Sequence, residues 1–145
     1  MNAMLAGLLA LTVAALFTGA AFYVGAVEQP ARMQLDDRAL LQQWKPSYKA
    51  GFVMQASLAV VGFLLGVLQW WWSGELLWLI GALILVANWP FTLIAILPTN
   101  NVLMGTPLDA AGPRSRALLV KWASLHAVRT ALGASATAVF LWAAA

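Results

Sequence analysis

The sequence contains no cysteine and very few charged side chains. Its 145 residues include eight Lys and Arg, five Asp and Glu and one His, so charged residues make up only 9% of the chain. A soluble globular domain carries about 25% charged residues. The lack of Cys excludes disulfides, cysteine metal sites and thiol-dependent quinone reductases. The chain also lacks the Lys/Arg stripe of a basic soluble fold, which excludes nucleic-acid binding.

Hydrophobic residues account for 63% of the chain and gather in four long runs. Each run can cross a hydrocarbon layer of about 30 Å as a helix. We therefore predict an all-α protein, an integral membrane four-helix bundle that forms a single transmembrane domain over residues 1–145. The expected spans are residues 2–27, 50–72, 76–97 and 117–143. A cleavable signal peptide is the alternative for the first span, but no basic residues precede it and its apolar run exceeds the usual core of about 7–15 residues.

The basic residues predict the orientation of this bundle. All eight lie between the first two spans, between the last two spans, or in the first turns of the fourth helix. By the positive-inside rule, the two longer connections are cytoplasmic and both termini lie on the outer face. With no targeting peptide recognised, we expect a multi-pass protein of the bacterial inner (plasma) membrane.

Prolines mark the expected ends of helices. The composition of residues 36–44 is typical of a short interfacial helix, which Pro46 would stop. Pro90 lies inside the third span and should free a backbone carbonyl, and Pro98 should end that span.

Tryptophan and glycine predict how the second and third spans meet. Residues 70–72 are three consecutive Trp, followed closely by Trp78, and we expect this cluster to anchor a tight hairpin at the bilayer interface. Gly62 and Gly66 form a GxxxG pair, which indicates close approach of a neighbouring helix.

The most unusual side chains lie at the start of the fourth span. Trp122, His126 and Arg129 are spaced i, i+4 and i+7, so they share one face of a helix. At 1.5 Å per residue, Arg129 lies roughly 12 Å beyond Lys121. A charge inside a membrane costs on the order of 3 kcal/mol on insertion scales and marks a functional site by default.

Other polar residues should meet this face. Asn88, Thr92 and Thr99 share a face of the third span and could form a pocket wall. In an up-and-down bundle, the matching helix ends converge and form a pocket, here open to the cytoplasm or inner leaflet. The residues expected there are Glu28, Arg32, Tyr48, Thr99, Asn100, Trp122, His126 and Arg129. Glu28 is the expected counter-ion of Arg129.

Each of these residues also has a purely structural interpretation. His126 could hydrogen-bond across helices, and Arg129 could pair with Glu28 or cap carbonyls freed by Pro98. Trp122 could anchor the helix at the interface, Asn100 could be a turn residue, and Asn88 could hold helices together. Apart from Asn88, these residues are all expected at the same end of the bundle, so it is less probable that every one of them has only a structural role. A shared functional site is therefore the better interpretation.

Three segments together resemble a known family. They are residues 18–32, which include the runs TGAAFYV and VEQPAR, then the PTN run at residues 98–100, and the WASLHAVR run at residues 122–129. In these segments the chain resembles the anthrone oxygenase-like family of small four-helix membrane proteins. The resemblance covers essentially the whole chain.

The resemblance implies an activity and a set of residues. It implies O2-dependent oxidation of an anthrone, a reduced tricyclic polyketide, at its central methylene, without a dedicated metal or flavin. We therefore expect no cofactor and no metal site. The family motif carries over to Asn100, Trp122, His126 and Arg129, and less securely to Glu28. Fold transfers between relatives better than reaction does.

The chemistry of such an oxidation can be matched to these side chains. An anthrone methylene is acidic because deprotonation gives an aromatic phenolate, which can react with O2. The reaction needs a base, donors for the oxyanion and an apolar slot that excludes water. We predict His126 as the base, with Arg129 and Asn100 as oxyanion donors. Trp122 and Tyr48 would stack on the substrate, with Glu28, Thr99 and Asn88 completing the binding site.

Other classes of protein remain as alternatives. A non-enzymatic binder of lipids or small hydrophobic molecules is the first, and a small transporter is the second, although an exporter would place its carboxylate in mid-helix. A single His makes haem or metal binding weak unless a dimer supplies a second one. The expected partners are thus a hydrophobic aromatic molecule or lipid and the membrane itself, with a homo-oligomer left open.

Overall fold

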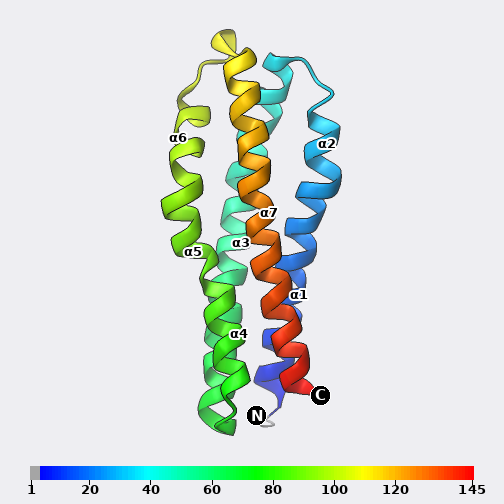
Figure 1. The fold of residues 1–145 in the computed structure, drawn as a ribbon, viewed down its shortest axis with the longest axis vertical. Helices are drawn as coiled ribbons and strands as arrows, with labels where there is room; N and C mark the ends of the chain where they lie inside the picture. The colour runs from blue at the N-terminus through cyan, green and yellow to red at the C-terminus, as the bar shows by residue number, and fades with distance from the viewer. Residues whose placement is uncertain (1–3) are drawn as a thin grey trace.

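The computed structural model describes residues 4–145 and is built from helices alone in that range. Figure 1 shows four long helical segments running side by side. In chain order the elements are α1 (Leu5–Tyr23), η1 (Val24–Glu28), α2 (Gln29–Arg32), α3 (Asp37–Ser73), α4 (Leu76–Val86), α5 (Asn88–Phe91), η2 (Thr92–Ile96), α6 (Leu97–Gly105), η3 (Leu108–Ala110) and α7 (Pro113–Ala144). The expected all-α four-helix architecture is confirmed. The expected start of the first span, at residue 2, lies outside the described residues.

Four segments of this fold are long and apolar enough to cross a membrane, which indicates a multi-pass membrane protein. They are Leu5–Arg32, Asp37–Ser73, Leu76–Gly105 and Pro113–Ala144. The longest segment, α3, has 37 residues. At 1.5 Å per residue it measures roughly 55 Å, well beyond the hydrocarbon thickness of about 30 Å. Part of the bundle therefore projects out of the hydrocarbon layer.

The helix α3 is continuous where the sequence suggested a break. Residues 36–44 do not form a separate interfacial helix, because α3 runs from Asp37 through Pro46 to Ser73. Its N-cap is Asp36, whose carboxylate accepts hydrogen bonds from the backbone N–H groups of Arg38 and Ala39, both at 3.0 Å. Gly74 ends the helix with a φ of 73°, a left-handed conformation that glycine adopts without strain.

Two π-helical turns interrupt the first and third segments, and each lies just before a proline. In η1 the N–H of Gln29 donates to the carbonyl of Val24, and Pro30 follows. In η2 the N–H of Leu97 donates to the carbonyl of Thr92, and Pro98 follows. Such i→i+5 turns occur mostly as single bulges, often at functional sites.

The third segment therefore continues past Pro98 instead of ending there. Pro98 lies in the first turn of α6, where its missing N–H is tolerated. The segment is instead interrupted earlier, because α4 ends at Val86 and α5 begins at Asn88, two residues before Pro90. Figure 1 shows the change of direction at this point.

The four segments form an up-and-down bundle. The helix α1 packs against α3 and α7, and α4 packs against the same two helices from the other side. Both chain ends lie at one end of the bundle in Figure 1, and the connections from α2 to α3 and from α6 to α7 lie at the other. These two connections and the adjoining helix ends carry most of the basic residues.

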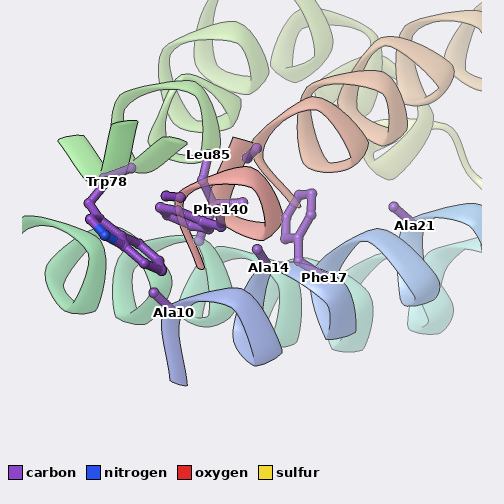
Figure 2. Packing of buried hydrophobic residues seen from close by; sticks show 11 residues of the cluster. Ala10, Ala14, Phe17, Ala21, Trp78, Leu85 and Phe140 are labelled. Carbon is purple, nitrogen blue, oxygen red and sulfur yellow. The ribbon is translucent and has the colours of Figure 1, made fainter. Parts of the chain in front are cut away.

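The half of the bundle near the termini is held by a tightly packed apolar core. Figure 2 shows Phe17, Trp78 and Phe140 meeting there from α1, α4 and α7. Trp78 is buried and stacks on Phe140, with ring centroids 5.6 Å apart, so it is a core residue and not part of the predicted interfacial cluster. At Gly66 an added Cβ would lie 2.9 Å from both Ala82 and Phe140, which confirms the close helix approach predicted from the GxxxG pair.

The other half of the bundle has its own core. Its buried members are Leu40, Leu41, Trp44, Ile96, Leu103, Leu119 and Trp122. Buried polar side chains accompany these cores on all four segments: Gln29, Arg32, Gln55, Asn88, Thr92, Thr99, Asn100, His126 and Arg129. Two of them contact the second core, since Gln29 donates to the carbonyl of Leu119 and Arg32 lies over the ring of Trp122.

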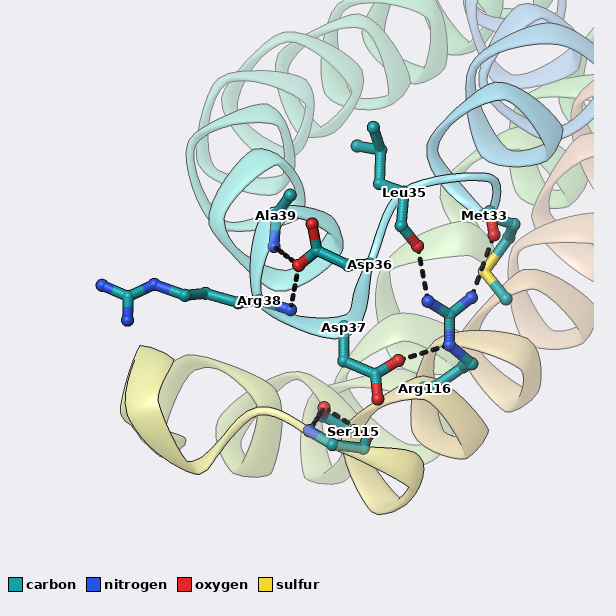
Figure 3. A network of polar contacts seen from close by, with 9 residues as sticks. Met33, Leu35, Asp36, Asp37, Arg38, Ala39, Ser115 and Arg116 are labelled. Atoms are coloured by element: carbon teal, nitrogen blue, oxygen red, sulfur yellow. Dashed lines mark hydrogen bonds and ion pairs between the residues drawn. The ribbon is translucent and has the colours of Figure 1, made fainter.

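The connections at this end are fastened by Arg116 near the start of α7. Figure 3 shows its guanidinium donating to the backbone carbonyls of Met33 at 2.9 Å and Leu35 at 2.5 Å. Its Nε also donates to the carboxylate of Asp37 at 2.5 Å. One side chain therefore joins α7 to the turn between α2 and α3.

Candidate functional site

Several of these buried polar side chains line a pocket between the four segments, which we call the main pocket. It encloses about 440 Å³ of empty space, its mouth included. Its lining residues are Val24, Glu28, Arg32, Ser47, Tyr48, Gly51, Phe52, Gln55, Ile96, Asn100, Trp122, His126 and Arg129.

Most of the predicted site residues lie in this pocket. His126, Arg129, Asn100, Trp122, Tyr48 and Glu28 all line it. Thr99 is buried but does not line the main pocket, and Asn88 instead lines a neighbouring cavity. The i, i+4, i+7 face predicted for α7 is confirmed, since Trp122, His126 and Arg129 all point into the bundle as buried residues.

The hydrogen bond of His126 fixes the tautomer of its neutral ring. Its Nε2 lies 2.9 Å from the backbone carbonyl oxygen of Ala21 in α1. A carbonyl oxygen can only accept a hydrogen bond, so Nε2 carries the proton and donates it. The other nitrogen, Nδ1, is buried and has no hydrogen-bond partner within residues 4–145. The unprotonated nitrogen is therefore the one left for a ligand.

A series of aromatic rings supports the imidazole. Trp122 stacks on His126 with ring centroids 4.9 Å apart and an interplanar angle of 14°. The edge of Trp44 meets Trp122 at 5.9 Å, and Trp44 in turn stacks on Tyr48 at 4.9 Å. Such pairs add about 0.5–1.5 kcal/mol beyond burial. The orientation of the His126 ring is thus set by its hydrogen bond to Ala21 in α1 and by its stacking on Trp122 in α7.

Glu28 pairs with a different arginine from the one predicted. Its carboxylate forms an ion pair with Arg32, one turn further along the same segment, and accepts a hydrogen bond from Gln43 at 3.2 Å. The predicted pair between Glu28 and Arg129 is therefore wrong. Residues four apart on a helix face each other, and the i, i+4 spacing of Glu28 and Arg32 was the signal for this pair in the sequence.

Arg129 is buried without a carboxylate partner. Only 8% of its surface is exposed, and it forms no salt bridge with any residue from 4 to 145. Its Nε has no hydrogen-bond partner in the same range, while the guanidinium carbon lies 5.7 Å from the centre of the Phe17 ring. A cation over an aromatic face gains about 0.5–2 kcal/mol. The ring holds this cation in place but leaves its charge available to an anion.

The side-chain amide of Asn100 likewise has no hydrogen-bond partner among residues 4–145. It is 1% exposed, and both its amide nitrogen and its amide oxygen lack partners within the described part of the chain. Buried polar groups are nearly always hydrogen-bonded to protein, water or a ligand. Because Asn100 lies within α6, the structure does not support its interpretation as a turn residue. The main pocket thus contains an unused donor and acceptor beside a free cation and a free ring nitrogen.

Arg32 lines the main pocket, as the sequence predicts, but several other lining residues were not predicted. They include Gln55, Ser47 and Phe52. Gln55 is 2% exposed and is the only strongly polar residue deep in the expected second span, a signal that was present in the sequence. Phe52 and Ser47 carry no comparable signal, because apolar and small residues are ordinary in a membrane helix.

A smaller space, which we call the lateral cavity, adjoins the main pocket. Its empty volume is about 270 Å³, mouth included. Its lining residues are Phe52, Gln55, Ala56, Ala59, Asn88, Trp89, Thr92, Leu93 and Arg129.

Among residues 4–145 no three His, Cys, Asp or Glu side chains come together as a metal site.

Comparisons with known proteins agree on one family. The family model for anthrone oxygenase matches residues 44–139. An anthrone oxygenase of Claviceps purpurea is 31% identical over 130 residues, which cover 79% of this chain and 74% of that protein. The anthrone oxygenase tpcL of Aspergillus fumigatus is 35% identical over 99 residues, which cover 63% of this chain and 62% of that protein. No solved structure matches the chain. The chain therefore belongs to the anthrone oxygenase family, a family of oxidoreductases.

Proposed function

We propose that this protein oxidises the activated methylene of an anthrone-like aromatic substrate with O2. The observation that carries the proposal is a set of groups in one pocket that have no hydrogen-bond partner among residues 4–145: His126 Nδ1, Arg129 Nε and the Asn100 amide. A base, a cation and a neutral donor are the groups that formation of a phenolate requires. Membership of the anthrone oxygenase family supports the same class of substrate.

The proposed first step is proton transfer. His126 Nδ1 takes a proton from the methylene carbon, and the negative charge moves to the ring oxygen as the anthrone becomes aromatic. Arg129 and Asn100 hold that oxygen, and the rings of Tyr48 and Trp122 contact the polycycle. Donors placed in advance around a developing oxyanion contribute about 10²–10³-fold to the rate.

Oxidation of the anion then needs O2 alone. The anion passes an electron to O2 and its carbon forms a bond to oxygen, which gives a hydroperoxide after the proton returns from His126. Loss of the second methylene hydrogen as a proton, with cleavage of the O–O bond, leaves a carbonyl and releases water. Anthrone and O2 thus give anthraquinone and water, with four electrons passed to O2 in all.

We also propose that the main pocket faces the cytoplasm. The two connections at its end of the bundle, with the adjoining helix ends, carry nearly all the basic residues, and basic loops stay on the cytoplasmic side. The bacterial inner membrane is the membrane we propose for this chain.

Oxygen uptake by the purified protein tests the proposed reaction. With anthrone as substrate and a chelator present, we expect wild-type uptake above buffer and a loss of about 10²–10⁴-fold in His126→Ala, as for other general bases. Asn100→Ala should lose activity, whereas Asn101→Ala, an exposed neighbour outside the main pocket, should not. Folded wild type without uptake, or His126→Ala with full uptake, would contradict the proposal. Binding of anthrone without turnover would favour the role of a non-enzymatic binding protein.

A further inference from the structure

The lateral cavity has no role in the proton and oxygen chemistry proposed above, yet Arg129 lines it as well as the main pocket. It shares Phe52, Gln55 and Arg129 with the main pocket. These three side chains therefore form a common wall, and movement of Phe52 or Gln55 would join the two spaces. The lateral cavity lies on the side of the bundle where α3 faces α5 and η2.

The mouth of the lateral cavity lies on the outside of the third segment, which is apolar enough to cross a membrane. Leu93, on its rim, is 49% exposed, and Trp89 is 37% exposed. Leu93 lies 17 residues beyond Leu76, the start of α4, which is roughly 26 Å along a helix. That depth is within a hydrocarbon layer of about 30 Å. A molecule entering here would come from the membrane and not from water.

A hydrogen bond between two helices lies at the rim of the lateral cavity. The indole Nε1 of Trp89 donates to the backbone carbonyl of Ala56 in α3 at 3.2 Å. This bond fixes α5 against α3 through a large flat side chain at the edge of the mouth. The rim therefore offers an aromatic surface beside the opening.

The interior of the lateral cavity contains unused polar atoms. Asn88 is 2% exposed; its amide nitrogen donates to the carbonyl of Leu85 at 3.0 Å, and its amide oxygen has no partner within residues 4–145. The guanidinium of Arg129 lies at the inner wall with its Nε unpartnered. The acceptor at Asn88 and the donor at Arg129 complement the hydroxyl and carbonyl groups of an oxygen-bearing aromatic molecule.

We propose that the lateral cavity is an entry port, through which an apolar, oxygen-bearing aromatic substrate passes from the bilayer to the main pocket. This proposal rests on the function proposed above for the main pocket. Arg129, at the wall between the two spaces, contacts the substrate on both sides, and Asn88 is a positioning residue on the way in. Such a substrate is far more soluble in the membrane than in water, so a lateral route supplies it at the higher concentration.

Binding kinetics of a redox-inert probe test the port. We would mix proteoliposomes with liposomes that contain anthraquinone and follow quenching of the protein's tryptophan fluorescence by stopped flow. Leu93→Trp fills the mouth from η2, and Ala56→Leu narrows it from α3. The matched control is Ile94→Trp, which places the same indole on the adjacent residue, 78% exposed and outside the cavity.

A port affects rates and leaves the equilibrium unchanged. Leu93→Trp and Ala56→Leu should each lower the association and dissociation rates about tenfold, with the Kd within about twofold of wild type, and Ile94→Trp should leave both rates unchanged. Rates in both mouth variants that match wild type would overturn the port, as would the absence of any anthraquinone binding by folded wild type. Wild type that binds with these kinetics but consumes no O2 with anthrone would overturn the proposed reaction and leave the port standing.

Discussion

Arg129 on α7 lies over the ring of Phe17 on α1, and this aromatic contact takes the place of an ion pair. The guanidinium carbon is 5.7 Å from the ring centre, and no carboxylate from residue 4 to residue 145 forms a salt bridge with it. On insertion scales, placing an arginine side chain at the centre of a membrane helix costs about 3 kcal/mol. The protein therefore retains a costly group where its proposed chemistry needs a positive charge.

Replacing Arg129 should raise the stability of the protein and lower its activity. We expect Arg129→Met to raise the free energy of unfolding by about 1–3 kcal/mol, because an unpaired buried charge is removed and its volume is kept. Oxygen uptake with anthrone should fall by at least about 10²-fold. Unfolding by SDS in detergent micelles measures the first effect and an oxygen electrode the second. A variant that is both destabilised and active would refute this account.

The pair formed by Glu28 and Arg32 should behave in the opposite way. Glu28→Gln leaves Arg32 buried with a weaker partner, so the free energy of unfolding should fall by about 1–3 kcal/mol. The double variant Glu28→Gln with Arg32→Met should recover most of that loss, because no uncompensated charge remains. A double-mutant cycle measured by SDS unfolding gives the coupling between the two side chains. Additive effects would mean that the ion pair contributes nothing measurable.

Close packing at Gly66 gives a prediction that does not depend on the site. A Cβ at this position would lie 2.9 Å from both Ala82 and Phe140, so Gly66→Ala should lower the free energy of unfolding by about 1–3 kcal/mol. Gly19→Ala is the matched control, since no side chain lies within 4 Å of its Cβ position, and its stability should be unchanged or higher by up to about 1 kcal/mol. Thermal unfolding in detergent compares the two. Equal melting temperatures would show that α3 can move away from its neighbours at no cost.

The contacts of Arg116 predict where the chain opens first. Arg116→Ala removes three hydrogen bonds to the turn between α2 and α3, and we expect a loss of about 1–2 kcal/mol together with faster protease cleavage in residues 33–36. Arg114 is exposed at the same helix end, and the hydrogen bonds and the salt bridge to this turn come from Arg116 and not from Arg114. Arg114→Ala should therefore be cleaved at the wild-type rate. If both variants were cleaved at similar rates, Arg116 would not be the residue that stabilises the turn between α2 and α3.

The number of helices and the core of the site could both be predicted from the sequence. Four apolar runs are a strong signal, because a membrane accepts few other structures. His126 and Arg129 were identifiable since a lone His and a charge deep in an apolar run stand out at helical spacing. Asn100 was identified through the family motif.

Helix ends and charge partners were harder to predict. Pro46 was expected to stop a helix, but the carbonyl it frees belongs to Gln42, which is exposed and can be hydrated. Pro98 lies where a π turn restarts the helix, so its missing N–H costs little. The partner of Glu28 was sought on another helix although Arg32 lies one turn away. At both prolines the helix tolerates the missing hydrogen bond, and Glu28 pairs within its own segment instead of with another helix.

The two π turns also have a consequence for how helix length relates to the site. A π turn contains one residue more than an α turn of the same extent, so η1 and η2 each resemble a single-residue insertion in an otherwise regular helix. Because the bulge absorbs the additional residue, the helix beyond η2 keeps the orientation it would have without that residue. If the same residues formed a regular α-helix, everything beyond them would be rotated by about 100°, and Asn100 would turn away from the pocket. The bulge, which hydropathy does not reveal, therefore decides where Asn100 points.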